Sequence, residues 1–298
     1  MRYISLHSIE RIASVLVVAA IACVVADSRT WMALVISAAT GHYLLSVGYS
    51  RKQIAQVCSR PGPLAGFLAL ILAGIFLYRG GFPLIVIFGI HHVFNEVYLL
   101  DRTLKLRDRG EAAFFRTSSI LVNFSLYFAT VRSYEELHWI NHMFLFASVA
   151  VTCVLFLVAL TRVRQVVEPS RILDCVIFEV VGLALLAVSF YRPINVFHVV
   201  LYHCVFWGVY PLQKMARQGA GEVGRYLGQN AVSIGAAFLV SPLAFVAVHF
   251  SDANWDAFFR FSSWLHIMMA FGLSTAHPAW ITRLFQAGPP AGSAPTTT

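Results

Sequence analysis

The sequence predicts an all-α protein, a polytopic membrane helix bundle of about ten transmembrane helices with both termini on the cytoplasmic side. Charged residues make up 12% of the 298 positions, whereas roughly 25% is usual for a soluble domain. Hydrophobic residues reach 58%, and the mean hydropathy is +0.72. This composition excludes a soluble globular enzyme, a disordered chain and a DNA-binding domain, although the isoelectric point is near 9.5.

Ten apolar segments have the length that a membrane-spanning helix needs, about 20 residues. In order, they cover 11–27, 30–50, 63–79, 82–101, 113–131, 137–162, 171–191, 193–214, 230–250 and 257–284. The longest polar connections, 102–112 and 215–229, are too short to hold a further domain. We therefore expect a single transmembrane helical domain over 1–285, followed by a Pro/Gly/Ala/Thr-rich tail, 286–298, that should be disordered.

The basic residues support this order of segments, because Lys and Arg collect on cytoplasmic connections. Seventeen of the 22 lie on one side: Arg2, Arg11, Arg51, Lys52, Arg60, Arg102, Lys105, Arg107, Arg109, Arg116, Arg162, Arg164, Arg171, Lys214, Arg217, Arg225 and Arg283. Five lie on the other: Arg29, Arg79, Arg132, Arg192 and Arg260. The net charge of +8 is therefore mostly a topology signal and does not indicate nucleic-acid binding. We expect a multi-pass protein of a bacterial-type cytoplasmic (inner) membrane, with the first segment retained rather than cleaved as a signal peptide.

Eleven histidines occur in this apolar chain, and several fall near the middle of the expected spans. At a rise of about 1.5 Å per residue, His42 lies about 18 Å from the outer end of its span, and His91, His92, His203 and His266 lie about 14–15 Å from theirs. His277 lies about 30 Å in. Ionisable groups at membrane depth usually have a function. Each His alone is explained equally well by a hydrogen bond to a neighbouring helix, but four helices with a His at similar depth favour a shared metal site.

Helical geometry limits which of these residues act together. His92 and Glu96 are one turn apart on one face, and His91 lies off that face. His266 and His277 lie about 16 Å apart along one helix, so they do not both bind one ion. Glu96 and Glu179 are the candidate catalytic acids, which would orient ligand imidazoles by accepting hydrogen bonds.

A second histidine pair has metal-competent spacing but an unsuitable position. His138 and His142 are four residues apart at the outer end of their span, beside Trp139. This position favours an interfacial belt of aromatic and polar residues over a metal site. The five cysteines show no CxxC spacing, and they predict neither a disulfide framework nor a zinc knuckle.

Four segments, taken in order, resemble the Brp/Blh family, the membrane β-carotene 15,15′-dioxygenases. They are Gly41-His42-Tyr43-Leu44-Leu45-Ser46, then Ile90-His91-His92-Val93-Phe94-Asn95-Glu96, then Leu201-Tyr202-His203-Cys204-Val205-Phe206-Trp207 with Pro211-Leu212-Gln213-Lys214 after it, and Leu273-Ser274-Thr275-Ala276-His277-Pro278. The chain departs from the family pattern at three positions. Ser46 and Glu96 each stand in place of an Asp, and Trp207 stands in place of a His that the family is thought to use as an iron ligand.

The resemblance implies a non-haem Fe(2+) centre with open positions for O2 and an apolar carotenoid or related isoprenoid lipid as substrate, entering from the membrane. By the family match, the ligands or their close supports would be His42, His91, His203 and His277; by depth, His92 and His266 come next. Two other functions stay open at this point: a haem-binding or electron-transfer membrane subunit, and a proton or metal transporter that uses the intramembrane His and Glu groups.

Overall fold

A computed structural model describes residues 6–77, 81–104, 109–164 and 167–273. These residues form twelve α-helices, one short 3-10 helix and no strand, which confirms the all-α prediction. The α-helices are α1 Leu6–Val24, α2 Ser28–Tyr49, α3 Arg51–Cys58, α4 Pro61–Leu77, α5 Gly81–Leu104, α6 Arg109–Thr130, α7 His142–Val163, α8 Pro169–Val188, α9 Val196–Gln218, α10 Ala220–Gln229, α11 Ala231–Phe250 and α12 Trp255–Leu273, and the 3-10 helix is η1 Glu135–Leu137.

Four helical segments are long and apolar enough to cross a membrane: Ser28–Tyr49, Phe82–Leu100, His142–Val163 and Ala231–Phe250. A fifth candidate is the pair formed by Arg51–Cys58 and Pro61–Gly74, which bends by 110° between its two helices. These segments are consistent with a membrane protein, as the composition indicates.

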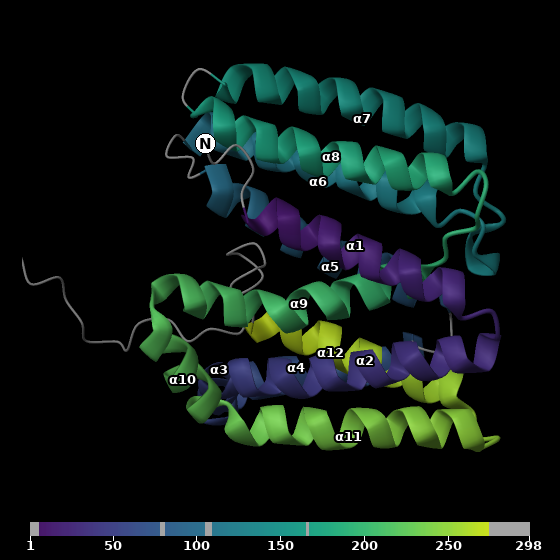
Figure 1. The fold of residues 1–298 in the computed structure, drawn as a ribbon, viewed down its shortest axis with the longest axis vertical. Coiled ribbons are helices and arrows are strands. Elements are labelled where there is room, and N and C mark those ends of the chain that lie inside the picture. The colour runs from purple at the N-terminus through teal and green to yellow at the C-terminus, as the bar shows by residue number, and fades with distance from the viewer. Residues whose placement is uncertain (1–5, 78–80, 105–108, 165–166, 274–298) are drawn as a thin grey trace, which may run out of the picture.

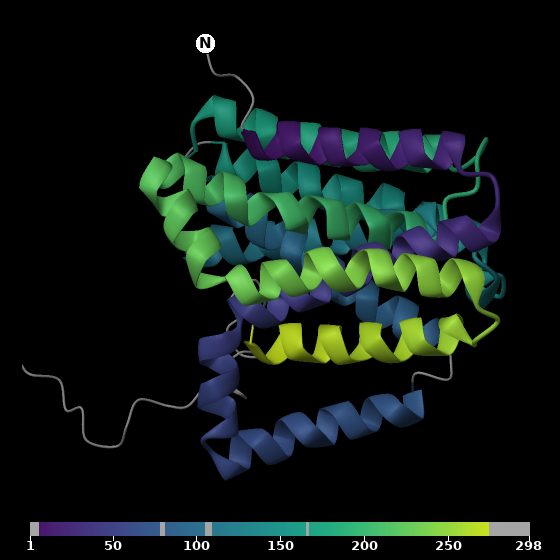
Figure 2. The ribbon, with the colours of Figure 1, turned by 60° about the horizontal axis from the view of Figure 1, so that its bottom comes forward.

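The long helices run side by side along one direction, and α3 and α10 lie at one end of the bundle (Figures 1 and 2). Neither short helix is among the ten expected segments, and α10 occupies most of the expected connection 215–229. The expected segment 137–162 also begins too early, because η1 and a turn precede α7. The Asn141 side chain caps α7 there by accepting a hydrogen bond from the Met143 backbone N–H, 2.8 Å away.

Helix α5 joins two parts of the core. Near its start, Leu84, Ile85 and Phe88 pack in a cluster with α2, α9 and α12, and near its end Leu100 and Leu104 pack in a second cluster with α6, α7 and α8. The segment Phe82–Leu100 is accordingly 61% buried, against 11% to 28% for the other three apolar segments. Helix α1 lies between the two groups of helices (Figure 1). Residues on α5 are therefore held from several sides.

Side-chain caps fix where the helices that carry histidines begin. Asp27 caps α2 by accepting hydrogen bonds from the Arg29 and Thr30 backbone N–H groups, 2.9 and 3.1 Å away. Hydrogen bonds from the Thr30 side chain first and from its backbone N–H second hold the pKa of the Asp27 carboxyl below its usual value. Asn195 and His198 form a reciprocal capping box at the start of α9. Because a cap fixes the first turn, it also fixes the rotation at which later residues of the helix face their neighbours.

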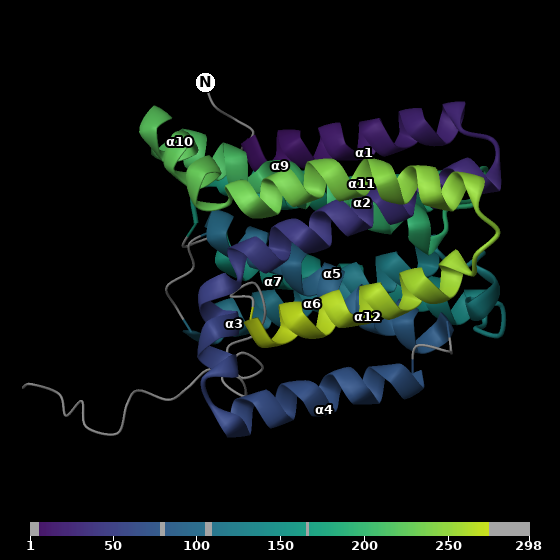
Figure 3. The same cartoon turned by 90° about the horizontal axis from the view of Figure 1, so that it is seen from below.

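Helix α4 lies at the margin of the bundle and packs against α12 (Figure 3). The Trp264 indole N–H donates to the Leu70 carbonyl oxygen, 3.3 Å away. Gly74 lies one turn above Leu70, and a Cβ atom at Gly74 would overlap the Trp264 indole. The missing side chain therefore allows α12 to approach the α4 backbone.

We expect Gly74→Ala to lower the free energy of unfolding by about 1–3 kcal/mol, because overpacking against Trp264 exceeds the gain in helix propensity. Gly66→Ala is the matched control on α4, since a Cβ there meets nothing within 4 Å. It should be neutral or stabilising by up to about 1 kcal/mol. Thermal unfolding in detergent micelles measures both, and equal stability of the two variants would contradict the close contact.

Candidate metal centre

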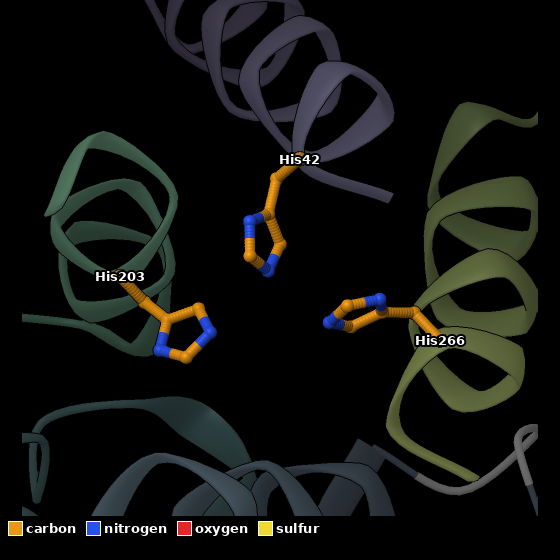
Figure 4. A group of neighbouring side chains, drawn as sticks. All are labelled: His42, His203 and His266. Atoms are coloured by element: carbon orange, nitrogen blue, oxygen red, sulfur yellow. The ribbon is translucent and has the colours of Figure 1, made fainter. Parts of the chain in front are cut away.

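Three histidines from three helices point toward one another in the middle of the bundle (Figure 4). They are His42 on α2, His203 on α9 and His266 on α12, and each offers a ring nitrogen within 4.8 Å of the others. The His42 ring centroid lies 5.1 Å from that of His203 and 4.7 Å from that of His266. Residues separated by more than 220 positions in the chain thus form one group of imidazoles, named the histidine trio below.

A fourth histidine, His91 on α5, adjoins the trio. Its Nε2 atom lies 3.3 Å from Nε2 of His203, and its ring centroid lies 5.4 Å from that of His266. Asn95, one turn further along α5, places its amide nitrogen 3.2 Å from His91 Nε2. The four helices that the depth argument selected from the sequence therefore do bring one histidine each to a common place.

One polar contact and one ring stack hold His266 in position. The Ser46 hydroxyl lies 3.1 Å from His266 Nδ1, and the Tyr43 ring stacks on the imidazole with centroids 4.4 Å apart. The Tyr43 hydroxyl is in turn 2.7 Å from the Ser263 hydroxyl. Sequence reasoning singled out Ser46 only as a departure from a family pattern, and it missed Tyr43 and Asn95. Helical spacing was the available signal for Ser46 and Asn95, because each lies four residues after a candidate histidine.

The trio has the donor set of a metal site. Imidazole nitrogens are common ligands of iron, copper and zinc. The His42 Nε2 atom is buried and has no hydrogen-bond partner in the described part of the chain. An ion centred among three nitrogens 4.8 Å apart would lie roughly 2.8 Å from each, about 0.7 Å beyond a normal metal–nitrogen bond. Small side-chain rotations would close that difference, so the residues fit a metal ion with three protein ligands and open coordination positions.

His92 borders the trio, with its ring centroid 5.8 Å from that of His203, but its polar contact is with an acid and not with the trio. His92 Nδ1 is 3.9 Å from Glu96 Oε1, as their shared helix face predicts. Glu96 is paired with Arg11 of α1 at 2.9 Å, and it also accepts a hydrogen bond from the Tyr202 hydroxyl at 3.3 Å. Glu179 accepts a hydrogen bond from the Asn123 amide at 3.0 Å. In these contacts both carboxylates face polar groups other than the trio imidazoles. The imidazoles are supported instead by Ser46, which contacts His266, and by Asn95, which contacts His91.

The remaining histidines considered from the sequence do not take part in the trio in the described part of the chain. His138 and His142 are exposed, His138 directly after η1 and His142 at the start of α7. His198 takes part in the α9 capping box. His277, the family-based candidate on the last helix, lies outside the described residues, as does the tail 286–298.

Two cavities lie beside the histidines and the Arg11–Glu96 pair. The first, named the histidine cavity, has a volume of about 480 Å³ and is lined by the trio, His91 and Trp207 among others. The second, named the α1–α8 cavity, has a volume of about 410 Å³ and is lined mostly by apolar residues of α1, α8 and α9, with Arg11, His92 and Glu96 at its wall. Trp207, which stands where the resembling family has a His, has its ring centroid 6.2 Å from that of His203.

Comparisons with protein-family models, with curated proteins and with solved structures gave no match to this chain.

The Arg11–Glu96 pair is buried, with 6% and 2% of the two side chains exposed. We expect Arg11→Met to destabilise the protein by about 3–5 kcal/mol, because the Glu96 carboxylate stays buried without its cation. The double variant Arg11→Met, Glu96→Met should recover most of that loss. Thermal unfolding in detergent micelles gives the three free energies.

The exposed pair between Arg29 and Asp252 is the control, because an ion pair in water contributes little. Arg29→Met should leave the unfolding midpoint nearly unchanged. A loss for Arg11→Met no larger than that for Arg29→Met would contradict the buried, uncompensated charge.

Proposed function

We propose that this protein is a membrane-embedded, non-haem iron oxygenase that oxidatively cleaves β-carotene or a related carotenoid or isoprenoid lipid to retinal-type apocarotenals. The observation that carries the proposal is the histidine trio, with His91 against it, in the buried centre of a bundle of apolar helices. The order of the motifs that resemble the Brp/Blh family adds the reaction type and the choice of Fe(2+).

The proposal includes the topology of the chain. Ten helices of 17 to 24 residues would each cross the membrane, namely α1, α2, α4 to α9, α11 and α12. Both termini would lie on the cytoplasmic side, at the end of the bundle where α3 and α10 lie. Arg51, Lys52 and Arg225 belong to these two short helices, as the positive-inside rule requires of that end.

Each histidine has a definite part in the proposed site. His42, His203 and His266 would hold the ion through neutral imidazoles, and His91 would either complete the ligand set or donate a hydrogen bond into it. Ser46 and Asn95 would fix the orientation of His266 and His91. Iron bound there would supply the activation of O2. The protein residues supply the open coordination positions and a buried site that limits access of water.

The α1–α8 cavity supports an apolar substrate. Its lining residues run along α1 from Ser8 to Cys23, a distance of roughly 22 Å. Ala19, Ala22 and Gly182 leave space between the helices that line the cavity because their side chains are small or absent. His92 and Tyr202 form the wall nearest the trio, since the His92 and His203 ring centroids are 5.8 Å apart. A long apolar chain lying in this cavity would therefore reach the side of the trio from within the membrane.

Loss of metal by single variants tests the site. His203→Ala should abolish iron binding by the purified protein, because it removes a ligand at the centre of the group. His142→Ala should retain the iron of the unchanged protein, since His142 is exposed at the start of α7. Metal analysis of detergent-purified samples measures the iron bound per protein molecule in each variant. Equal loss from both variants would place the site elsewhere.

The activity is tested in a bacterial host that accumulates β-carotene. Expression should lower carotene and produce retinal, and His203→Ala should leave the carotene unchanged. Pigment extraction and chromatography measure both compounds. Unchanged carotene together with no bound iron would refute the proposed function, whereas bound iron with unchanged carotene would restrict it to another lipid.

The contact of Ser46 with His266 gives a further test. Ser46→Ala should weaken metal affinity by roughly 10- to 100-fold, because removal of a group that orients a ligand imidazole has that typical effect. Ser37→Ala is the control on the same helix, since the Ser37 hydroxyl donates to the Ser241 carbonyl at 2.8 Å and does not contact the trio. Competition with a chelator measures both affinities, and a loss of the same size from both variants would contradict the role of Ser46.

A further inference from the structure

The histidine cavity is lined by cations and by no acid in the part of the chain that the structure describes. Arg51, Lys52 and Lys214 line it together with the trio and His91. Lys214 is half-buried, and no carboxylate lies within ion-pair distance of it among the described residues. A positively charged cavity without acids favours an anionic occupant.

The proposed metal site adds to this imbalance. Three neutral imidazoles leave the charge of a divalent ion uncompensated, and a buried charge is costly unless a counter-charge lies near it. Glu96 does not supply that counter-charge, because its carboxylate is already paired with Arg11 at 2.9 Å. An anionic ligand in the histidine cavity would supply that counter-charge.

Donors suited to an oxyanion are also present. The Trp207 indole N–H is buried, lines the histidine cavity and has no hydrogen-bond partner in the described structure. An indole N–H can only donate, so it needs an acceptor. Lys214 supplies three N–H donors on a charged group, and hydrogen bonds from charged donors to oxyanions are the stronger kind.

The positions along the helices give the length of the occupant. His203 and Lys214 are eleven residues apart on α9, which corresponds to roughly 16 Å. His42 lies seven residues before the end of α2 at Tyr49, which corresponds to roughly 10 Å, and Arg51 begins α3 just beyond that end. Trp207, Tyr210 and Pro211 lie between His203 and Lys214 on α9 and line the cavity, as does Met269 of α12, so an apolar chain finds contacts there beside polar residues such as Asn95.

From these observations we infer that the histidine cavity binds an amphipathic molecule whose carboxylate or phosphate head is held by Lys214 and Arg51 and whose apolar chain reaches the histidine trio. This inference goes beyond the proposed function, because it gives the histidine cavity an acidic ligand of its own and leaves the apolar carotenoid substrate in the α1–α8 cavity. As a binding site, it does not depend on metal, because the head-group residues are separate from the trio.

The test uses metal-free protein, stripped with a chelator and held in a neutral maltoside detergent. Dodecyl phosphate and dodecanoate should each raise the thermal unfolding midpoint by at least about 3 °C relative to dodecanol at the same mole fraction. Lys214→Gln should abolish that difference, and Lys214→Arg should retain it. Arg164→Gln, which removes an exposed cation at the C-terminal end of α7, should also retain it.

Three results would overturn the inference. The first is an equal midpoint with dodecanol and with the two acids. The second is an undiminished difference in Lys214→Gln. The third is an equal shift from inorganic phosphate, which would show that the alkyl chain of the ligand contributes nothing to binding. A shift in protein that carried no iron when first purified, before the chelator was added, would sustain the binding site and refute the proposed function. Carotene cleavage by protein that shows no shift would sustain the proposed function and refute the binding site.

Discussion

The burial of four imidazoles among apolar helices is the constraint on which the rest of this structure depends. Polar groups in a hydrocarbon environment must find partners within the protein. His42, His91, His203 and His266 come from four helices, and each helix must adopt a particular rotation for the rings to meet. The caps at the starts of α2 and α9 and the central position of α5 help to fix those rotations.

The buried ion pair between Arg11 and Glu96 separates two chemical environments. The pair neutralises the Glu96 carboxylate, which lies beside His92, and it links α1 to α5 across 85 positions of the chain. The guanidinium also lies 4.0 Å from the centroid of the Phe178 ring on α8, which adds a cation–π contact. On this side, the α1–α8 cavity is mostly apolar and its buried Arg11 and Glu96 are paired. On the other side, the histidine cavity is lined by imidazoles, by Arg51, Lys52 and Lys214, and by no acid among the described residues.

This separation gives a physical basis for the two proposals. An apolar chain is favoured in the α1–α8 cavity because most of the lining residues are apolar and the buried Arg11 and Glu96 are paired, while an acidic group is favoured at the Lys214 end of the histidine cavity. The trio lies between the two environments. A lipid oxygenase needs such an arrangement, since its substrate is mostly apolar and its metal ion carries charge.

The sequence by itself determined the helical class, most helix positions and the four helices that each bring a His to a common level, because apolar length and a rise of 1.5 Å per residue depend only on local order. It also placed His92 and Glu96 on one face, as the structure has them. It did not determine α3 and α10, which are too short for an apolar-length criterion. Only the tertiary structure decided that His266 joins His42 and His203 while His92 faces Arg11 and Glu96. The reason is that contacts between distant helices depend on the rotation and packing of each helix, as the fit of Trp264 against Gly74 illustrates, and periodicity along one helix does not specify the helix it meets.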